Sequence, residues 1–256
     1  MAGSDPSGGA GLQADLKTFH QFGVYGMSVV TLVTVQNTRR VRAVKPLDAE
    51  LVREQLEAVL EDIPPGAAKT GALGTTEIIE VIAAAAGRFA FPLVVDPVMI
   101  SKHGAALIAE DAREALVRRL LPAAFLVTPN LAEAAALAGI PVAGIDAMEE
   151  AARRIAGLGP RAVLVKGGHL GGDAVDVLYY KDRLRRFSAR RVDSKNTHGT
   201  GCTYSAAITA GLARGSDLET AIEAAKRYIT EAIAQSPGLG SGCGPVDHHA
   251  RLSRDA

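Results

Sequence analysis

The chain has no tryptophan and few other aromatic residues. Of its 256 residues, 4% are Phe, Trp or Tyr, whereas 48% are hydrophobic. A protein of this composition must build its core from aliphatic side chains and alanine, and the hydrophobic share is ample for a packed core. We therefore predict a globular fold with an aliphatic core.

The chain also lacks a net charge. Lys and Arg together number 28, as do Asp and Glu, so the formal net charge is +0. The chain therefore lacks the excess of positive charge that is typical of a general nucleic-acid-binding protein, and we expect no nucleic-acid partner. One basic cluster alternates with Leu184 and Phe187, which is typical of a solvated strand face. It consists of Lys181, Arg183, Arg185, Arg186, Arg190 and Arg191.

Cysteines are few, and long apolar runs are missing. Cys202 and Cys243 have no spacing typical of a zinc site or a disulfide framework, so the cytoplasm is the expected compartment. No apolar run approaches the ~18 residues of a membrane-spanning helix, and the N-terminus lacks a signal-peptide pattern. We expect no membrane partner.

Asparagine occurs only three times, at positions 37, 130 and 196. A scarcity of labile amides is typical of proteins from heat-adapted sources. All three asparagines fall inside the motifs described below. In a chain that otherwise avoids this residue, their placement favours a functional role.

Apolar, strand-like runs alternate with amphipathic, helix-like stretches along the chain. This alternation predicts an α/β fold with a mostly parallel sheet covered by helices on both faces. The predicted strands are 26–35, 67–70, 92–95, 125–128 and 162–166. The predicted helices are 12–22, 49–61, 75–86, 111–120, 147–157, 201–213 and 218–235.

An antiparallel hairpin is expected at the edge of this sheet. Its strands are predicted near 175–180 and 183–190, joined at Lys181 and Asp182. We find no internal repeat, low-complexity tract or linker in the sequence. One domain over residues 1–256 is therefore expected.

Polar residues follow three of the predicted strands. Asp96 and Asn130 come directly after two of them, and Lys166 closes a third. Ligand sites in open α/β sheets lie just beyond the carboxyl ends of the strands. We expect these three residues to gather in one crevice.

Residues 196–207, Asn-Thr-His-Gly-Thr-Gly-Cys-Thr-Tyr-Ser-Ala-Ala, combine a glycine-rich turn with the start of a helix. Gly199, Thr200 and Gly201 can turn sharply and present N–H groups at the positive end of the helix, which makes an anion hole. Cys202 falls in the first helical turn, where the dipole favours a thiolate that could accept a proton. Taken alone, the segment also fits a plain turn beside a small buried cysteine.

This segment resembles the phosphate-transfer signature of the hydroxymethylpyrimidine and phosphomethylpyrimidine kinases, the thiamin-pathway branch of the ribokinase-like superfamily. Other segments resemble further motifs of that family in the family's order, and together they cover nearly the whole chain. They are Ala-Gly-Ser-Asp-Pro-Ser-Gly-Gly-Ala-Gly-Leu-Gln-Ala-Asp at 2–15, Gln-Asn-Thr at 36–38, Asp-Pro-Val-Met at 96–99, Thr-Pro-Asn-Leu-Ala-Glu at 128–133 and Val-Lys-Gly-Gly-His at 165–169. Such a set is far more specific than any one motif.

The resemblance implies a ribokinase-like fold and a bifunctional kinase. ATP, with Mg²⁺, would phosphorylate 4-amino-5-hydroxymethyl-2-methylpyrimidine to its monophosphate and then to its diphosphate. Gly199, Thr200 and Gly201 would hold the moving phosphoryl group. Lys166 would reach the ATP phosphates as a point charge. Without the resemblance, the same residue could be an ordinary exposed lysine. Cys202 would be the base, where the superfamily commonly carries Asp.

Asn130 and Glu133 share one helix face and resemble the N-x-x-E element that lies near Mg²⁺ and phosphate in the superfamily. The same spacing fits a helix N-cap closed by a capping box, and the two roles are compatible. Asp96 fits either an influence on Mg²⁺-bound water or the end of a strand before Pro97. Both readings of Asp96 stay open.

The substrate pocket is predicted from hydrogen-bond donors and acceptors. An aminopyrimidine offers ring nitrogens and an amino group, so an amide that both donates and accepts matches it. Gln36 meets this need and the resemblance places it against the pyrimidine, although alone it fits a turn. The resemblance adds Asp15 and the backbone at Gly3 around the amino group and hydroxymethyl arm, with Val98 as an apolar wall. Ala72 stands where many relatives carry Met, which predicts a roomier pocket.

Several histidines are also interpreted from the sequence. We interpret His198 as an anchor of its loop, His103 as part of a segment that resembles a mobile flap, and His248 and His249 as solvated.

In the family, an apolar strand precedes the Ala-Gly-Ser-Asp-Pro motif, whereas here the motif follows Met1 directly. A shortened strand would leave a gap beside the substrate loop and lower the stability.

Two alternative functions remain open. A pyridoxine or pyridoxal kinase of the same superfamily also phosphorylates a hydroxymethylated nitrogen heterocycle, and Gln36 and the second phosphorylation distinguish it. A non-catalytic pyrimidine or nucleotide sensor would be expected to lose the anion-hole glycines, Lys166 or the base, and all are present. The sequence leaves a homodimer open as an assembly.

Overall fold

The computed structural model describes residues 1–99, 104, 107–108, 111–168 and 171–251. Its strands are β1 (Ala2–Ser4), β2 (Val30–Asn37), β3 (Arg40–Pro46), β4 (Ala68–Thr70), β5 (Leu93–Val95), β6 (Leu126–Val127), β7 (Ala162–Lys166), β8 (Ala174–Tyr180) and β9 (Arg183–Ala189). Its helices are α1 (Gly11–Gln21), α2 (Ala49–Asp62), α3 (Thr76–Ala86), α4 (Ala112–Ala115), α5 (Leu131–Ala138), α6 (Ile145–Ala156), α7 (Thr200–Ala213) and α8 (Leu218–Ala234). A π-helical turn at Leu116–Leu120 and a 3₁₀ turn at Leu121–Ala123 extend α4.

Two sheets form the framework. The larger has the order β4-β5-β6-β7-β8-β9, with β4 to β7 parallel and β8 and β9 antiparallel. The smaller has the order β1-β2-β3, with β1 parallel and β3 antiparallel to β2. The predicted parallel sheet with an antiparallel edge hairpin is confirmed. The predicted strands did not include β1 or β3, and the strand predicted over 26–35 is found at Val30–Asn37.

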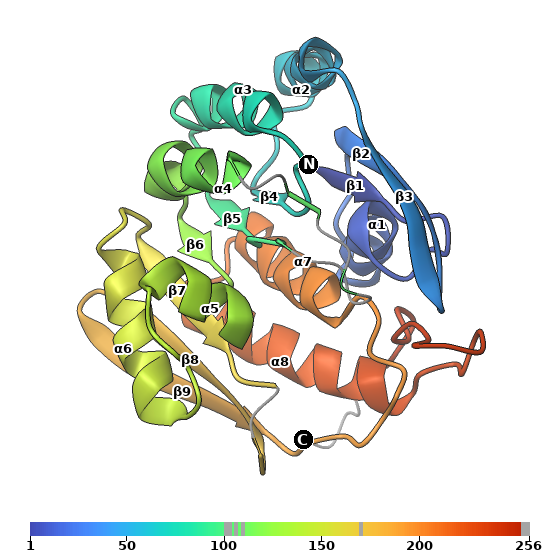
Figure 1. Ribbon diagram of the computed structural model, residues 1–256, viewed down its shortest axis with the longest axis vertical. Coiled ribbons are helices and arrows are strands. Elements are labelled where there is room, and N and C mark those ends of the chain that lie inside the picture. The colour runs from blue at the N-terminus through green and yellow to red at the C-terminus, as the bar shows by residue number, and fades with distance from the viewer. Residues whose placement is uncertain (100–103, 105–106, 109–110, 169–170, 252–256) are drawn as a thin grey trace.

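Helices cover both faces of the larger sheet (Figure 1). Successive residues of a strand point to opposite faces, so neighbouring valines enter different cores. Val94 packs with α7 and α8, whereas Val95 packs with α2 and α3 on the other face. Farther along the sheet, Val163 and Val165 pack against α5 and α6. These apolar strands are buried on both faces, as their near-continuous hydrophobic runs predict.

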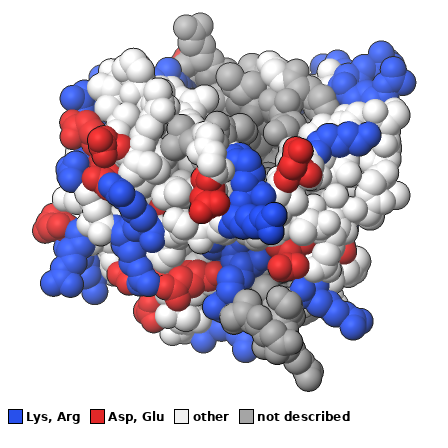
Figure 2. All heavy atoms as spheres, turned by 90° about the horizontal axis from the view of Figure 1, so that it is seen from below, with Lys and Arg blue, Asp and Glu red and all other residues white. Residues whose placement is uncertain are grey.

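The edge hairpin turns through Lys181 and Asp182, both with left-handed backbones (φ 50° and 59°). Two such residues form the tight turn that matches the twist of paired strands. On the outer strand, Arg185 pairs with Glu219 and Glu223, and Arg186 pairs with Glu149 at 2.6 Å. Basic and acidic side chains are intermixed on the face in Figure 2. The interpretation of this cluster as a solvated strand face is confirmed.

The N-terminal residues join the two sheets. The Met1 amine donates to the Lys69 carbonyl at 3.0 Å, and the Gly71 N–H donates to the Met1 carbonyl at 2.9 Å. On the other side, the Ala2 N–H donates to the Val29 carbonyl at 3.1 Å. A mostly apolar cavity of about 310 Å³ lies beside Met1, between α1, α2 and the segment that leads into β2.

Candidate functional site

Three of the predicted site residues lie close together at the carboxyl ends of β5, β6 and β7. The Lys166 ammonium lies 2.9 Å from the Asp96 carboxylate, which also accepts a hydrogen bond from the Thr128 hydroxyl at 3.3 Å. Asn130 follows β6 and bridges to Lys166 through the backbone. The expectation that Asp96, Asn130 and Lys166 gather is confirmed, because parallel strands end at the same edge.

A glycine turn, residues 199–201, lies against this ion pair and is called the anion turn below. Gly199 is the N-cap of α7 and has a left-handed backbone (φ 80°), which glycine adopts without strain. A Cβ atom built on Gly201 would lie 3.4 Å from Lys166 Nζ and 3.8 Å from Asp96 Oδ2. The positive end of the helix and the lysine therefore face the same space, which suits a phosphate.

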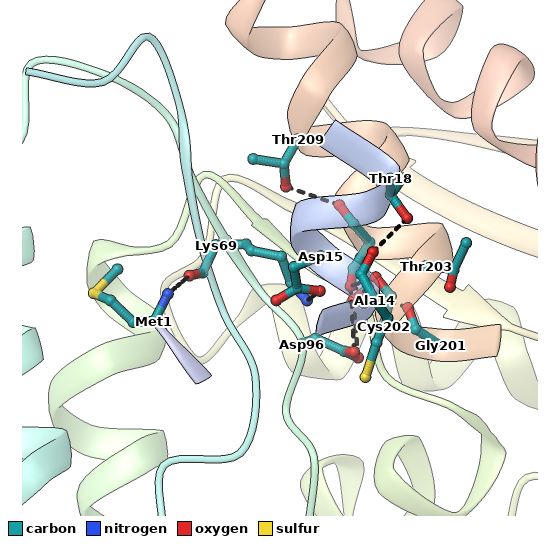
Figure 3. Close-up of polar contacts among 12 residues, drawn as sticks. Met1, Ala14, Asp15, Thr18, Lys69, Asp96, Gly201, Cys202, Thr203 and Thr209 are labelled. Carbon is teal, nitrogen blue, oxygen red and sulfur yellow. Dashed lines mark hydrogen bonds and ion pairs between the residues drawn. The ribbon is translucent and has the colours of Figure 1, made fainter. Parts of the chain in front are cut away.

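Cys202 is the third residue of α7 and lies in one group with Asp15, Lys69 and Asp96 (Figure 3). Burial raises the pKa of the Cys202 thiol to about 11, against the opposing effects of the Lys69 charge and the Gly11 N–H. The expectation that the helix dipole favours a thiolate at this position is therefore wrong. Loss of hydration outweighs the dipole here.

Lys69 is a buried cation that the sequence analysis missed. Its ammonium lies 2.6 Å from the Asp15 carboxylate, and the two side chains are 2% and 3% exposed. The other oxygen of Asp15 has no hydrogen-bond partner among the described residues. A lysine inside the predicted strand 67–70 was the available signal, because a buried charge needs a partner. Its partner lies 54 residues away in the chain.

Asn130 and Glu133 form the predicted capping box. The Asn130 side chain accepts from the Glu133 N–H at 3.0 Å, and the Glu133 carboxylate accepts from the Asn130 N–H at 2.8 Å. Burial raises the pKa of Glu133 to about 7, and the Lys166 charge opposes that rise. The cap thus holds a carboxyl group that exchanges its proton near neutral pH close to Lys166.

The predicted substrate residues come from β1, β2, α1 and the segment after β5. A Cβ atom built on Gly3 would lie 3.7 Å from the Ala72 Cβ, so these two residues are neighbours. Val98 is partly buried, and its N–H donates to the Asp96 carbonyl at 2.8 Å. Gln36 lies on β2, on the same face as Thr34. The Thr34 hydroxyl donates to the Ser4 carbonyl at 3.0 Å, so this face lies beside the end of β1.

The histidines have different environments. His198 is buried and contacts the Asp5 carboxylate at 2.9 Å, which confirms that it anchors its loop. His248 is also buried and contacts the Thr203 hydroxyl at 3.1 Å, so the expectation that it is solvated is wrong. The C-terminal segment packs over the first turns of α7 and removes His248 from water. His249 is exposed as expected, and His103 lies outside the described residues.

Two further properties concern the described part of the chain. No group of three or more His, Cys, Asp or Glu side chains converges there as a ready-made metal site. None of its helices is long and apolar enough to cross a membrane.

Known proteins resemble this chain over nearly its whole length. Residues 5–247 match the family described as phosphomethylpyrimidine kinase. A hydroxymethylpyrimidine/phosphomethylpyrimidine kinase of Rhizobium meliloti is 50% identical over 100% of this chain and 97% of its own length. The structure of a phosphomethylpyrimidine kinase from Clostridium difficile superimposes with a TM-score of 0.80, at 46% identity over 90% of this chain and 96% of that one.

A second solved structure carries a different activity in its name. It is an ADP complex of Bacillus subtilis pyridoxal kinase, with a TM-score of 0.90 and 41% identity over 97% of this chain and 95% of that one. The fold of the chain is therefore shared by kinases for two kinds of nitrogen heterocycle.

Proposed function

The chain belongs to the phosphomethylpyrimidine kinase family, and from this membership we propose that it phosphorylates 4-amino-5-hydroxymethyl-2-methylpyrimidine and then its monophosphate, in thiamin biosynthesis. ATP is the phosphate donor of such kinases. The observation that carries the proposal is the approach of Lys166 to the anion turn at the carboxyl ends of the strands. This arrangement joins a fixed cation to a helix N-terminus, which phosphoryl transfer requires.

Each residue has a defined part in this proposal. The N–H groups of the anion turn bind the moving phosphoryl group, and Lys166 offsets the charge on its oxygens. Cys202 lies beside Gly11, the first residue of α1 after the loop that follows β1, so its thiol is close to the proposed acceptor. Its conjugate base receives the proton of the hydroxymethyl group in the first transfer. Gln36, Gly3, Asp15 and Val98 form the proposed pyrimidine pocket.

Mg²⁺ is proposed as the metal that accompanies ATP. It usually retains several waters and binds one or two carboxylates together with the substrate phosphates. Asp96 and Glu133 provide two carboxyl groups close to Lys166, and Asn130 adds an amide oxygen, so the residues fit this need. Mg²⁺ would neutralise phosphate charge when bound. Asp96 meanwhile keeps Lys166 positioned through their ion pair.

A pyridoxal kinase activity is the second candidate, favoured by the pyridoxal kinase structure of TM-score 0.90. A coupled ATP assay with hydroxymethylpyrimidine, its monophosphate and pyridoxine as acceptors tests both functions. We expect turnover of the first two acceptors to exceed that of pyridoxine. Preferential turnover of pyridoxine would reverse the assignment. Absence of turnover with all three would support a non-catalytic sensor.

Gln36 gives a direct test of the pyrimidine pocket. Gln36→Leu keeps the approximate size of the side chain but leaves the polar edge of the heterocycle unpaired, at about 1–3 kcal/mol of binding free energy. Calorimetry should show weaker pyrimidine binding and unchanged binding of an ATP analogue. Arg40→Leu, an exposed change on neighbouring β3, is the control. Equal pyrimidine affinity of Gln36→Leu and the native protein would reject the contact.

The domain organisation, the cellular location and the oligomeric state are also proposals. The family match over residues 5–247 supports one kinase domain across the chain. Use of cellular ATP and small-molecule acceptors supports a cytoplasmic location. Light scattering would distinguish a monomer from the homodimer that the sequence leaves open.

A further inference from the structure

The loop after β1 and the anion turn touch through their backbones. Residues 5–10 are called the acceptor loop below, because the proposed function places the hydroxymethyl arm beside them. A Cβ atom built on Gly199 would lie only 1.8 Å from the Gly9 carbonyl oxygen. A Cβ atom on Gly9 would lie 2.7 Å from Cδ2 of the His198 ring. Both glycines therefore permit an approach that any side chain would prevent.

Asp5 organises the acceptor loop from inside. Its carboxylate is buried and accepts hydrogen bonds from the Ser7 N–H and hydroxyl, at 2.8 and 2.7 Å. It also accepts from the N–H groups of Gly9 and Ala10, at 3.1 and 2.8 Å. Burial favours the neutral acid, but the hydrogen bonds from His198 and Ser7 hold the pKa of Asp5 well below its usual range. Asp5 is therefore a carboxylate that holds the loop in one conformation.

His198 extends this network to the anion turn, which begins at the next residue. Its Nε2 lies 2.9 Å from Asp5 Oδ2. Its backbone is fixed on the other side, because its N–H donates to the Gly244 carbonyl at 3.0 Å and its carbonyl accepts from the Val246 N–H at 3.3 Å. The ring thus connects a backbone held by the C-terminal segment to the centre of the acceptor loop.

We propose that Asp5 and His198 are a positioning pair that sets the distance between the phosphate acceptor and the phosphoryl group. The inference rests on the proposed function, in which the acceptor loop faces the hydroxymethyl oxygen and the anion turn holds the phosphoryl group. Transfer depends steeply on this distance, since a displacement of about 1 Å can cost about 10²-fold in rate. Neither side chain needs to touch a reactant to have this effect.

Two variants of His198 distinguish a positioning role, which needs the hydrogen bond to Asp5, from a packing role, which needs only the volume of the side chain. His198→Gln supplies an amide N–H that can still donate to Asp5, whereas His198→Leu fills the site without a donor. We expect His198→Leu to lower kcat of the first transfer by about 10- to 100-fold. We expect His198→Gln to stay within about threefold of the native protein, and the affinity for a non-hydrolysable ATP analogue to be unchanged in both.

The control is Lys17→Met. The Lys17 ammonium donates to the Gly8 carbonyl at 2.7 Å, so this variant removes a different hydrogen bond from the same loop. It should leave kcat unchanged. Equal kcat for the Leu and Gln variants would overturn the inference. So would a loss of ATP-analogue affinity in step with kcat, because that outcome indicates general damage to the site.

Hydrogen exchange provides a measurement that is independent of turnover. In His198→Leu, the amides of Gly9 and Ala10 should exchange faster, because Asp5 loses one of the contacts that fix it. In His198→Gln they should remain protected. If the native protein phosphorylates none of the acceptors, the proposed function fails while the exchange experiment still tests the pairing. Unchanged exchange in both variants would reject the pairing itself.

Discussion

Lys166→Ala is expected to lower turnover by about 10²-fold or more while pyrimidine binding stays nearly intact, because the variant loses charge stabilisation in the transition state. The ammonium of Lys166 lies beside Gly201 of the anion turn and is held by Asp96 at 2.9 Å. It is therefore fixed before the phosphates arrive. Single-turnover kinetics with saturating ATP, together with calorimetry of the pyrimidine, measure the two quantities separately.

The ion pair requires a control for stability. Asp96 is 2% exposed, so removal of Lys166 leaves a buried carboxylate without its cation and destabilises the protein. Lys166→Gln retains a donor toward Asp96 but has no charge, and it should lose as much turnover as Lys166→Ala while unfolding at a higher urea concentration. Near-native turnover in either variant would remove Lys166 from the site.

The parallel core of the fold could be predicted because its strands are short, apolar and buried on both faces. The runs that end at Val95 and Lys166 have this character, and both strands lie where the sequence placed them. β3 was missed because Arg40–Pro46 is mostly charged or exposed and pairs only with β2. The start of α5 was predicted from the capping box of Asn130 and Glu133, but its extent over Leu131–Ala138 was not. Local patterns indicate buried strands better than exposed ones.

The parts of the candidate site that could be predicted are the residues at the ends of parallel strands. Asp96 and Lys166 gather because parallel strands end together, which sequence order is enough to indicate. The pair of Asp15 and Lys69 could not be predicted in this way, because it depends on how α1 packs against β4. The direction of the pKa shift at Cys202 was predicted wrongly for the same reason. The helix dipole can be inferred from the local sequence, whereas desolvation of the thiol depends on the tertiary packing around it.

Cys202→Ala is expected to cost about 10²–10⁴-fold in the first transfer, the usual range for loss of a general base. The acceptor of that step is a neutral hydroxyl group, which must lose its proton. The acceptor of the second transfer is a phosphate oxygen that is already largely ionised at neutral pH. Single-turnover assays on hydroxymethylpyrimidine and on its monophosphate should therefore show a selective loss in the first step. The anion turn continues to bind the phosphoryl group in both.

The pKa of the thiol adds a pH signature to this prediction. With a pKa of about 11, only a small fraction of Cys202 is thiolate near neutral pH. Because kcat/KM reports ionisations of the free enzyme, it should increase with pH for the first transfer, by up to about tenfold per unit below that pKa. Cys202→Ala should lose this increase, and kcat/KM for the second transfer should not depend on the residue.

Cys202→Ser separates the base from the packing role. Serine keeps the approximate size of the side chain at the start of α7, but its hydroxyl is a far weaker acid than a thiol and supplies no comparable base. It should therefore behave like Cys202→Ala in the first transfer and keep native binding of the ATP analogue. Equal, small losses in both transfers, with the pH dependence retained, would falsify the base assignment. Cys202 would then be a small packing residue beside Gly11, and the anion turn with Lys166 would carry the catalysis of both steps.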